Sequence, residues 1–519
     1  MVNRLFTLIF VLLFGFGYAQ KLDAVRFEVS SDLDGEQFHV ETMGVDGLLI
    51  FYESNEVSKE DLRKWYFGLF DTNLKQIWLK FVPLNDKIEF ITSREVDGQL
   101  HMLFKNVSMG RNDYGLYDIV TYDKRKKTFS RISGSIPIKS EVAGFEVIGN
   151  TACLALNLKK RETDLVFISL ITGDVNPIHI GIDTPGIIES LFADIENRLF
   201  YVSIKQNRDR RYIKEYLLSY TIDGKAKGEV LIDDNEALKY FREYVFVPSS
   251  KNELLILGTY NIVTGRTLSF KDIELGNDAK SAGLFFLKIV DGKQELLHYY
   301  DFMNLDNIAG AILPDNFRAN KVVQDTSSST KINTMVSASF NLNEPKVFRA
   351  NNGVYIFSVE VYQPYYKTET RMDYDFYGRP YPYTYNVFSG YDFYDAIIAG
   401  ISHDGVLLWS NDFPINDLLT YSTKRISTIF EDESLITLAY VNNGNVVSQT
   451  IDGPADIDRS EMKIGTNFPQ DRIAEDENNH IVRWYGDYFL IYGYEKVKNR
   501  TLDDQSTRAV FYANKIAYK

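Results

Sequence analysis

A turn signal that recurs about every 50 residues constrains this chain more than any other feature. Each turn contains Asp or Gly and lies between two apolar runs; the turns are found at Asp71, Asp123, Gly173, Gly224, Gly292, Gly405 and Gly453. The successive spacings are 52, 50, 51, 68, 113 and 48 residues. A repeat of this length made of short strands is typical of a β-propeller, in which each repeat forms one four-stranded blade.

The runs between the turns have the composition of strands. They are short, rich in Val, Ile, Leu, Phe and Tyr, and end at Gly, Asn or Asp. We therefore predict an all-β fold, a β-propeller of seven or eight four-stranded blades with loop insertions, over residues 20–519. Tandem β-sandwich domains are the alternative, but these would show turns about every 8 to 12 residues and no longer constant period.

The two ends of the chain are both strand-like, at residues 24–29 and 510–517. We predict that the N-terminal strand pairs beside the last strand, because such closure removes both free sheet edges.

The two longer spacings indicate insertions. In the 68-residue spacing, residues 236–244 predict a helical insert, and the 113-residue spacing contains either one blade with two insertions or two blades. We place the insertions at about 304–331 and 362–394. The first ends in the polar run 325–330, which predicts an exposed loop.

The insertion at 362–394 contains 13 Tyr and Phe residues. Pro364, Pro380 and Pro382 argue against a regular helix or a central strand through its middle, so we predict a large aromatic loop. Its rings either fold back on the propeller as a small separate core, or stay exposed and bind a partner. For the second interpretation the candidate binding residues are Tyr365, Tyr366, Tyr374, Tyr377, Tyr381, Tyr383 and Tyr385.

The N-terminus predicts export. Arg4, an apolar run at 5–16 and the small residues before Gln20 form the pattern of a signal peptide over residues 1–19. No later run is apolar enough to span a membrane. The single cysteine, Cys153, lies in an apolar run typical of a strand. We therefore expect a small buried side chain that forms no disulfide.

The formal charge of −14 argues against nucleic acid and anionic membrane surfaces as partners, because both require clustered Lys and Arg. We therefore expect no nucleic-acid partner.

No catalytic signature is present in the sequence. The six histidines are not spaced as metal ligands, and no nucleophile elbow, phosphate-binding loop or dinucleotide fingerprint occurs. We expect no catalytic residue, no redox cofactor and no zinc. The acidic runs 456–458 and 475–477 are candidates for calcium, although neither has the spacing of an EF-hand loop. Carboxylate pairs from different blades stay open, because 71 acidic residues give no basis for choosing among them.

The stretch from Tyr377 through FSGYDFYDAIIAGISHDGVLLWSNDF, which ends at Phe413, resembles exported propeller-like proteins of Bacteroidota cell envelopes, as does the GYAQ sequence at the end of the signal. The resemblance implies a periplasmic or outer-membrane setting and a role as accessory subunit of an outer-membrane complex. It supplies no catalytic residues.

These observations together predict a non-enzymatic binding or scaffold protein of the cell envelope, which recognises an envelope protein through its aromatic loop. The alternative is a carbohydrate-active propeller enzyme that uses carboxylates in the central channel. A cavity lined by convergent carboxylates favours the enzyme, and a flat aromatic loop over a filled channel favours the binding protein.

Overall fold

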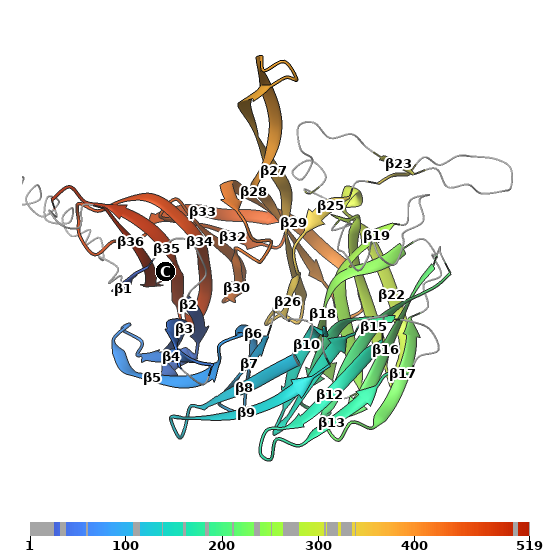
Figure 1. The fold of residues 1–519 in the computed structure, drawn as a ribbon. Helices are drawn as coiled ribbons and strands as arrows, with labels where there is room; N and C mark the ends of the chain where they lie inside the picture. The colour runs from blue at the N-terminus through green and yellow to red at the C-terminus, as the bar shows by residue number, and fades with distance from the viewer. Residues whose placement is uncertain are drawn as a thin grey trace, which may run out of the picture.

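Antiparallel strands make up most of the residues described in the computed structural model (Figure 1). The structure describes residues 25–31, 38–58, 61–106, 115–137, 139–158, 162–181, 186–209, 212–232, 239–250, 252–262, 280–305, 308, 320–322, 335–337, 339–501 and 507–517. Two short 3-10 helices, η1 (Gly44–Asp46) and η3 (Phe302–Asn304), are the helical elements within these ranges. No helix in the described ranges is long and apolar enough to cross a membrane.

Consecutive strands form seven sheets of four strands each. Blades 1 to 3 are β2 (Phe38–Thr42), β3 (Leu48–Val57), β4 (Leu62–Phe70) and β5 (Gln76–Asn85); β6 (Ile88–Val96), β7 (Gln99–Asn106), β8 (Gly115–Asp123) and β9 (Thr128–Ile136); and β10 (Glu141–Ile148), β11 (Thr151–Asn157), β12 (Thr163–Ser169) and β13 (Val175–His179). Blades 4 and 5 are β14 (Gly186–Asp194), β15 (Leu199–Asp209), β16 (Tyr212–Thr221) and β17 (Ala226–Ile232); and β18 (Lys239–Ser250), β19 (Glu253–Ile262), β21 (Gly283–Val290) and β22 (Lys293–Asp301). Blade 7 is β30 (Thr428–Asp432), β31 (Leu435–Asn442), β32 (Asn445–Asp452) and β33 (Ala455–Lys463), and blade 8 is β34 (Arg472–Tyr485), β35 (Tyr488–Lys498), β36 (Thr507–Ala517) and β1 (Val25–Ser30).

Blade 6 is larger than the others. Its long strands are β27 (Tyr355–Tyr374), β28 (Pro380–Ile401) and β29 (Leu407–Thr420). The place of a first strand is taken by two short strands that both pair with β27, β25 (Phe340–Leu342) and β26 (Lys346–Arg349), and β20 (Lys280–Ser281) extends the sheet beside β25. The pair β23 (Asn320–Val322) and β24 (Met335–Ser337) stands apart from the blades.

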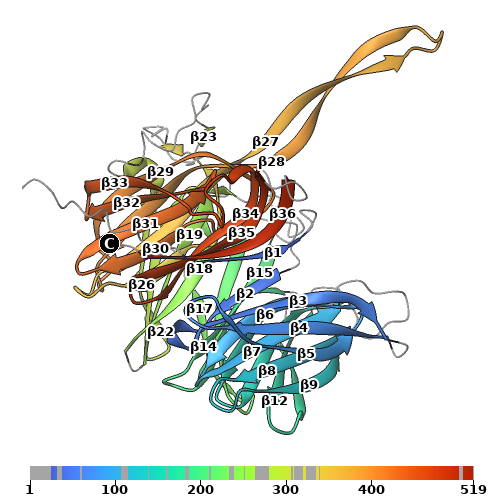
Figure 2. The same cartoon turned by 90° about the vertical axis from the view of Figure 1, so that its left-hand side faces the viewer.

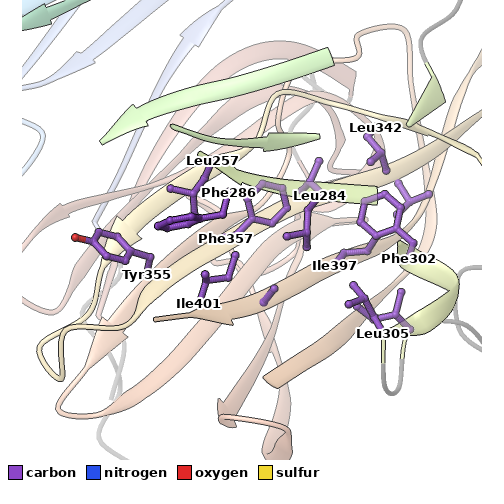
Figure 3. Packing of buried hydrophobic residues seen from close by; sticks show 14 of the residues in the cluster. Leu257, Leu284, Phe286, Phe302, Leu305, Leu342, Tyr355, Phe357, Ile397 and Ile401 are labelled. Atoms are coloured by element: carbon purple, nitrogen blue, oxygen red, sulfur yellow. The ribbon is translucent and has the colours of Figure 1, made fainter. Parts of the chain in front are cut away.

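The eight sheets are arranged around a common centre, and each packs against the next (Figures 1 and 2). Eight clusters of buried apolar side chains are found among the described residues, and each cluster joins two neighbouring blades. On one face of β3, Phe51 packs with Phe104 of blade 2; on the other face, Ile50 packs with Phe511 of blade 8. Figure 3 shows the cluster between blades 5 and 6. The eighth cluster closes the ring.

The ring is also closed by backbone pairing in blade 8. β1 pairs antiparallel with β36 over six residues, from Val25 opposite Lys515 to Ser30 opposite Val510. The predicted pairing of the N-terminal strand beside the last strand is therefore confirmed. The first strand of the chain completes the sheet that the last three strands begin.

The propeller prediction is confirmed, with eight blades. Gly292 and Gly405 lie in the last hairpins of blades 5 and 6, so the 113-residue spacing contains one blade with two insertions. Most of the first insertion, 304–331, lies outside the described residues, as do the polar run 325–330 and the predicted signal peptide.

The prediction of a helix at 236–244 was wrong where the structure describes it, because β18 begins at Lys239. A bulge between Phe241 and Tyr244 lets both rings pack in the same cluster. Two buried rings three residues apart are also found on one face of a helix, which explains the wrong prediction.

We predict that Arg26→Ala destabilises the closure. Arg26 donates to Glu495 at 2.7 Å and stacks over Tyr512, and the Glu495 side chain is fully buried. Removing the arginine leaves a buried carboxylate without its ion pair, which costs about 3–5 kcal/mol. The measurement is the free energy of unfolding by denaturant. Glu495→Gln added to Arg26→Ala should restore part of the loss, and equal instability of the single and double variants would contradict this explanation.

Candidate functional site

The insertion at 362–394 is a β-hairpin and not a loop, which corrects the sequence prediction. β27 and β28 are 20 and 22 residues long, and they pair from the blade to the tip with two register shifts near the base, at Val361/Tyr362 and Tyr365/Tyr366. The hairpin projects beyond the ring as a twisted two-stranded ribbon (Figures 1 and 2). In such a ribbon alternate N–H groups face outwards, so proline at those positions removes no ladder hydrogen bond.

Asp375 forms the turn at the tip of the hairpin. Its N–H donates to the carbonyl of Arg379 at 3.0 Å, and its carboxylate accepts from the N–H groups of Tyr377 and Arg379. Gly378 has a φ of 75°, a backbone conformation that residues with a side chain rarely adopt. Asp71 forms a similar turn in blade 1 with the same two kinds of backbone contact. The tip therefore reuses the turn chemistry of the blades.

The base of the hairpin belongs to the core of the propeller. Tyr362 and Phe393 pack in the cluster between blades 6 and 7, with their ring centroids 5.3 Å apart. Ring contacts continue outwards through Tyr391, Phe388 and Tyr366. This anchoring fixes the ribbon to the blade.

Beyond the base most of the aromatic side chains are exposed and Tyr385 is half-buried, so the interpretation as a separate small core is wrong. Phe376 and Tyr377 at the tip are 97% and 80% exposed, and Tyr374 is 67% exposed. A ribbon of two strands has no third layer against which these rings could pack.

One face of the ribbon carries a row of tyrosines. Tyr381, Tyr383 and Tyr385 alternate along β28 and so lie on the same face. The rings of Tyr383 and Tyr385 stack with centroids 5.9 Å apart, and the guanidinium of Arg371 lies 5.5 Å from each centroid. Tyr385 donates to Glu369 at 3.2 Å. These contacts hold the row in a defined orientation while Tyr381 and Tyr383 remain exposed.

The seven predicted binding residues are thus divided among three places. Tyr381, Tyr383 and Tyr385 share the tyrosine row; Tyr366 and Tyr374 lie on the opposite face, since they alternate with the residues that pair with the row. Tyr377 is in the tip, and Tyr365 is at the base opposite Gly390. Nothing in the structure tests whether any of them binds a partner.

A second candidate site lies at the centre of the ring. A cleft of about 410 Å³ is lined by the inner strands of blades 2 to 5 and by Glu344. Its charged lining residues are Arg94, Glu146, Glu189, Arg242, Glu243 and Glu344. We call this the inner cleft.

Two of these glutamates are held by cations. Arg94 donates to Glu146 at 2.8 Å, and the buried ammonium group of Lys205 lies 3.1 Å from Glu189. Glu243 opens to the cleft, but its surroundings are mostly protein, and the resulting desolvation raises the pKa of its carboxyl group above the ordinary value. Burial also raises the pKa of Glu146 above its ordinary value, so the inner cleft contains two carboxyl groups that hold their protons more strongly than usual.

The sequence could not select these acids, although a weak signal was present. Glu41, Arg94 and Glu146 are separated by 53 and 52 residues, close to the blade period. Charged residues that recur with the period of a propeller occupy equivalent places on successive inner strands.

His403 takes part in a polar cluster between blades 5 and 6. Its Nε2 lies 3.2 Å from Glu253, and its Nδ1 lies 3.4 Å from the hydroxyl of Ser249. The Ser249 hydroxyl also contacts Tyr355 at 3.1 Å, and Tyr355 belongs to the buried cluster in Figure 3. This cluster fixes the last hairpin turn of blade 6 against blade 5.

The described residues contain no group of three or more His, Cys, Asp or Glu side chains that could hold a metal ion. In the predicted calcium runs, Asp456 accepts from Asn411 and Gln449, and Glu475 pairs with Lys496. Cys153 is buried as predicted, and this burial raises the pKa of its thiol.

Asp395 is a buried carboxyl group at the base of the hairpin. It lies in β28 opposite Val361 and Pro414, and proline offers no backbone donor. Burial, with the neighbouring Asp412, raises its pKa to about 7.

No protein-family model and no curated relative matches the chain. Solved structures do match. The β-propeller domain of the Trilobed protease from Pyrococcus furiosus is 9% identical, over 82% of this chain and 95% of that one, with a TM-score of 0.32. The polysaccharide lyase Uly1 is 9% identical over 82% and 89%, with a TM-score of 0.38. The periplasmic gluconolactonase PpgL of Pseudomonas aeruginosa is 8% identical over 85% and 100%, with a TM-score of 0.36. Similarity this low carries no argument about activity.

We predict that Asp395 makes the folded protein less stable as the pH rises. Its folded pKa of about 7 lies above the ordinary 3.8, so the folded state binds this proton more tightly than the unfolded chain. The free energy of unfolding should therefore fall between about pH 4 and pH 7, by at most about 4 kcal/mol. Denaturant unfolding at a series of pH values measures this. Asp395→Asn should flatten the slope, whereas Asp404→Asn in an exposed turn should not; identical slopes in all three proteins would refute the assignment.

Proposed function

We propose that this protein is a non-enzymatic binding protein of the cell envelope, in which the propeller serves as a scaffold and the β27–β28 hairpin recognises another protein. The observation that carries the proposal is the tyrosine row of Tyr381, Tyr383 and Tyr385, held on a ribbon whose base is buried in the propeller. Oriented tyrosines with a neighbouring arginine are the residues that dominate protein interfaces.

The geometry of the hairpin supports this role for a physical reason. A partner that covers exposed rings gains from their burial without ordering a flexible loop, because the ribbon is already paired along its length. Because the ribbon projects from the propeller, it can contact a partner whose surface does not fit the body of the propeller.

The cell-envelope setting is part of the proposal. It is supported by the signal-like sequence at residues 1–19 and by the resemblance to Bacteroidota envelope proteins. On this basis the partner is an envelope protein, and the role is that of an accessory subunit in an outer-membrane complex, in the periplasm or at the cell surface.

We predict that replacing the tyrosine row abolishes partner capture and leaves the fold intact. In Tyr381→Ser/Tyr383→Ser/Tyr385→Ser the exposed rings are lost, and each buried aromatic anchor is worth about 2 kcal/mol or more at an interface. The measurement is affinity purification of the tagged protein from native envelopes, with thermal unfolding of the same variants. Tyr366→Ser/Tyr374→Ser is the matched control, because it removes tyrosines from the opposite face.

A deletion tests the role of the whole ribbon. Tyr362 and Phe393 are buried and must be kept. The deletion therefore removes the ribbon between residues 366 and 388 and joins the two strands with a short Gly-containing turn. The propeller should keep its melting temperature, since the removed residues lie outside the core and loop length affects stability only weakly. Unchanged capture by this deletion variant would end the recognition hypothesis.

The inner cleft favours a second candidate function, a carbohydrate-active enzyme. Glu243 retains its proton more strongly than an ordinary carboxyl group, and Glu189 lines the same cleft. Glycosidases use two carboxyl groups on the glycosidic bond, one as general acid and the other as base or nucleophile.

We predict that, under this second function, Glu243→Gln lowers the release of reducing ends from a susceptible polysaccharide at least about 100-fold. Asp404→Asn, in the exposed last turn of blade 6 and outside the residues that line the cleft, serves as the control. If the unaltered protein releases no product from a broad panel of polysaccharides, the enzyme candidate is rejected and the binding role stands.

A further inference from the structure

The outer edge of β27 is a feature of the hairpin separate from the tyrosine row. β25 pairs with β27 only at Val361 and Tyr362. From Gln363 to Tyr374, the partner of β27 among the described strands is β28 on its other side. This part of β27 therefore presents backbone groups along one free edge.

The direction of those groups follows from the tip. The hydrogen bond from Asp375 to Arg379 identifies a hydrogen-bonded pair, and such pairs alternate along an antiparallel ladder. The N–H and C=O groups that face outwards on β27 are then those of Tyr366, Thr368, Thr370, Met372 and Tyr374. At Tyr374 the N–H group already donates to the side chain of Asp373, so the carbonyl oxygen is the group that faces outwards for pairing.

The two edges of the ribbon are not equivalent. On β28 the outward positions nearest the tip are Pro380 and Pro382, which have no N–H group. Proline protects a free edge against pairing with another strand. β27 has no proline from residue 365 to residue 374, so its edge can accept a strand along this whole length, whereas the edge of β28 is interrupted near the tip.

The charges on β27 are self-complementary. Lys367, Glu369, Arg371 and Asp373 alternate in sign on one face of the strand. In an antiparallel pair of two copies with Thr370 opposite Thr370, each Lys367 faces Asp373 and each Glu369 faces Arg371. All four cross-strand pairs are then of opposite charge, which stabilises the pairing.

The same charges disfavour the two neighbouring registers, which are centred on Glu369 and on Arg371. A shift of one register in one direction places Glu369 opposite Glu369 and Lys367 opposite Arg371. A shift in the other direction places Arg371 opposite Arg371 and Glu369 opposite Asp373. Like charges opposite one another are destabilising, so the charges favour the register centred on Thr370 over both neighbouring registers, and no other register has four pairs of opposite charge.

The space at the base of the hairpin fits this register. With Thr370 opposite Thr370, the tip residue Tyr377 of one copy lies level with Gln363 of the other. β25 begins its pairing at the next residue, Tyr362. The tip can therefore lie against the base without displacing β25.

We propose that two copies of this chain associate through antiparallel pairing of their β27 edges from Tyr366 to Tyr374, in a two-fold symmetric dimer. The product is a four-stranded ribbon in which the tyrosine rows of both copies lie on the same face, since directly opposite residues point to the same side. The inference goes beyond the proposed function, which requires only a single hairpin.

A pair of proline variants tests the edge. Thr370→Pro removes the central outward N–H of β27, and the matched Thr384→Pro removes the outward N–H of the residue opposite it on β28. In sedimentation velocity over a range of concentrations, the unaltered protein and Thr384→Pro should form dimers, and Thr370→Pro should remain monomeric. Circular dichroism should be the same for all three.

A charge exchange tests the register. Lys367→Glu and Asp373→Lys should each weaken the dimer about tenfold or more, because by symmetry two attractive pairs become repulsive. An equimolar mixture of the two variants should form heterodimers, since each new charge then faces its opposite.

A monomeric unaltered protein, a dimer that survives Thr370→Pro, or a mixture that fails to associate would overturn the proposal. The variant Tyr381→Ser/Tyr383→Ser/Tyr385→Ser should still dimerise, because its β27 edge is unchanged. Loss of partner capture and loss of the dimer are thus measured on different variants, so either proposal can fail alone.

Discussion

Every blade in this protein depends on its neighbours, because each sheet buries both of its faces. In β3, Leu49 and Phe51 pack towards blade 2, while Leu48 and Ile50 pack towards blade 8. A single blade would expose one or both of these surfaces, and a row of blades would leave two of them open at its ends. The ring is the arrangement that covers all of them, and β1 completes it by adding a strand from the start of the chain to the last sheet.

The closed propeller supports the base of the long β27–β28 hairpin. A two-stranded ribbon is marginal in water without support. Here the ring contacts of Tyr362 and Phe393 tie the ribbon to the core, and cross-strand contacts such as Thr370 with Thr384 continue along it. The resulting stiffness is what allows exposed tyrosines to keep one orientation outside the protein body.

The inner cleft and the hairpin place different chemistry at two locations of one scaffold. Glu146 and Glu189 lie in the cleft beside cations, as expected for carboxylates withdrawn from bulk water. The tyrosine row, in contrast, is surrounded by solvent and by the charged side chains of β27. The cleft is a small cavity lined by charged groups, whereas the row is an exposed aromatic surface.

The sequence by itself determined most of the blade strands and the blade period, because apolar strand runs and Asp- or Gly-containing turns depend on a few neighbouring residues. The closing pair of β1 and β36 followed from a different argument, that a ring must cover its two end strands. The sequence also located the aromatic insertion. Only the tertiary structure decided that this insertion is a ribbon, because whether Pro380 and Pro382 disrupt pairing depends on which way their backbone nitrogens face. Only the ring brought Glu146, Glu189 and Glu243 into one cleft, because these residues lie on three successive inner strands and no local interaction connects them.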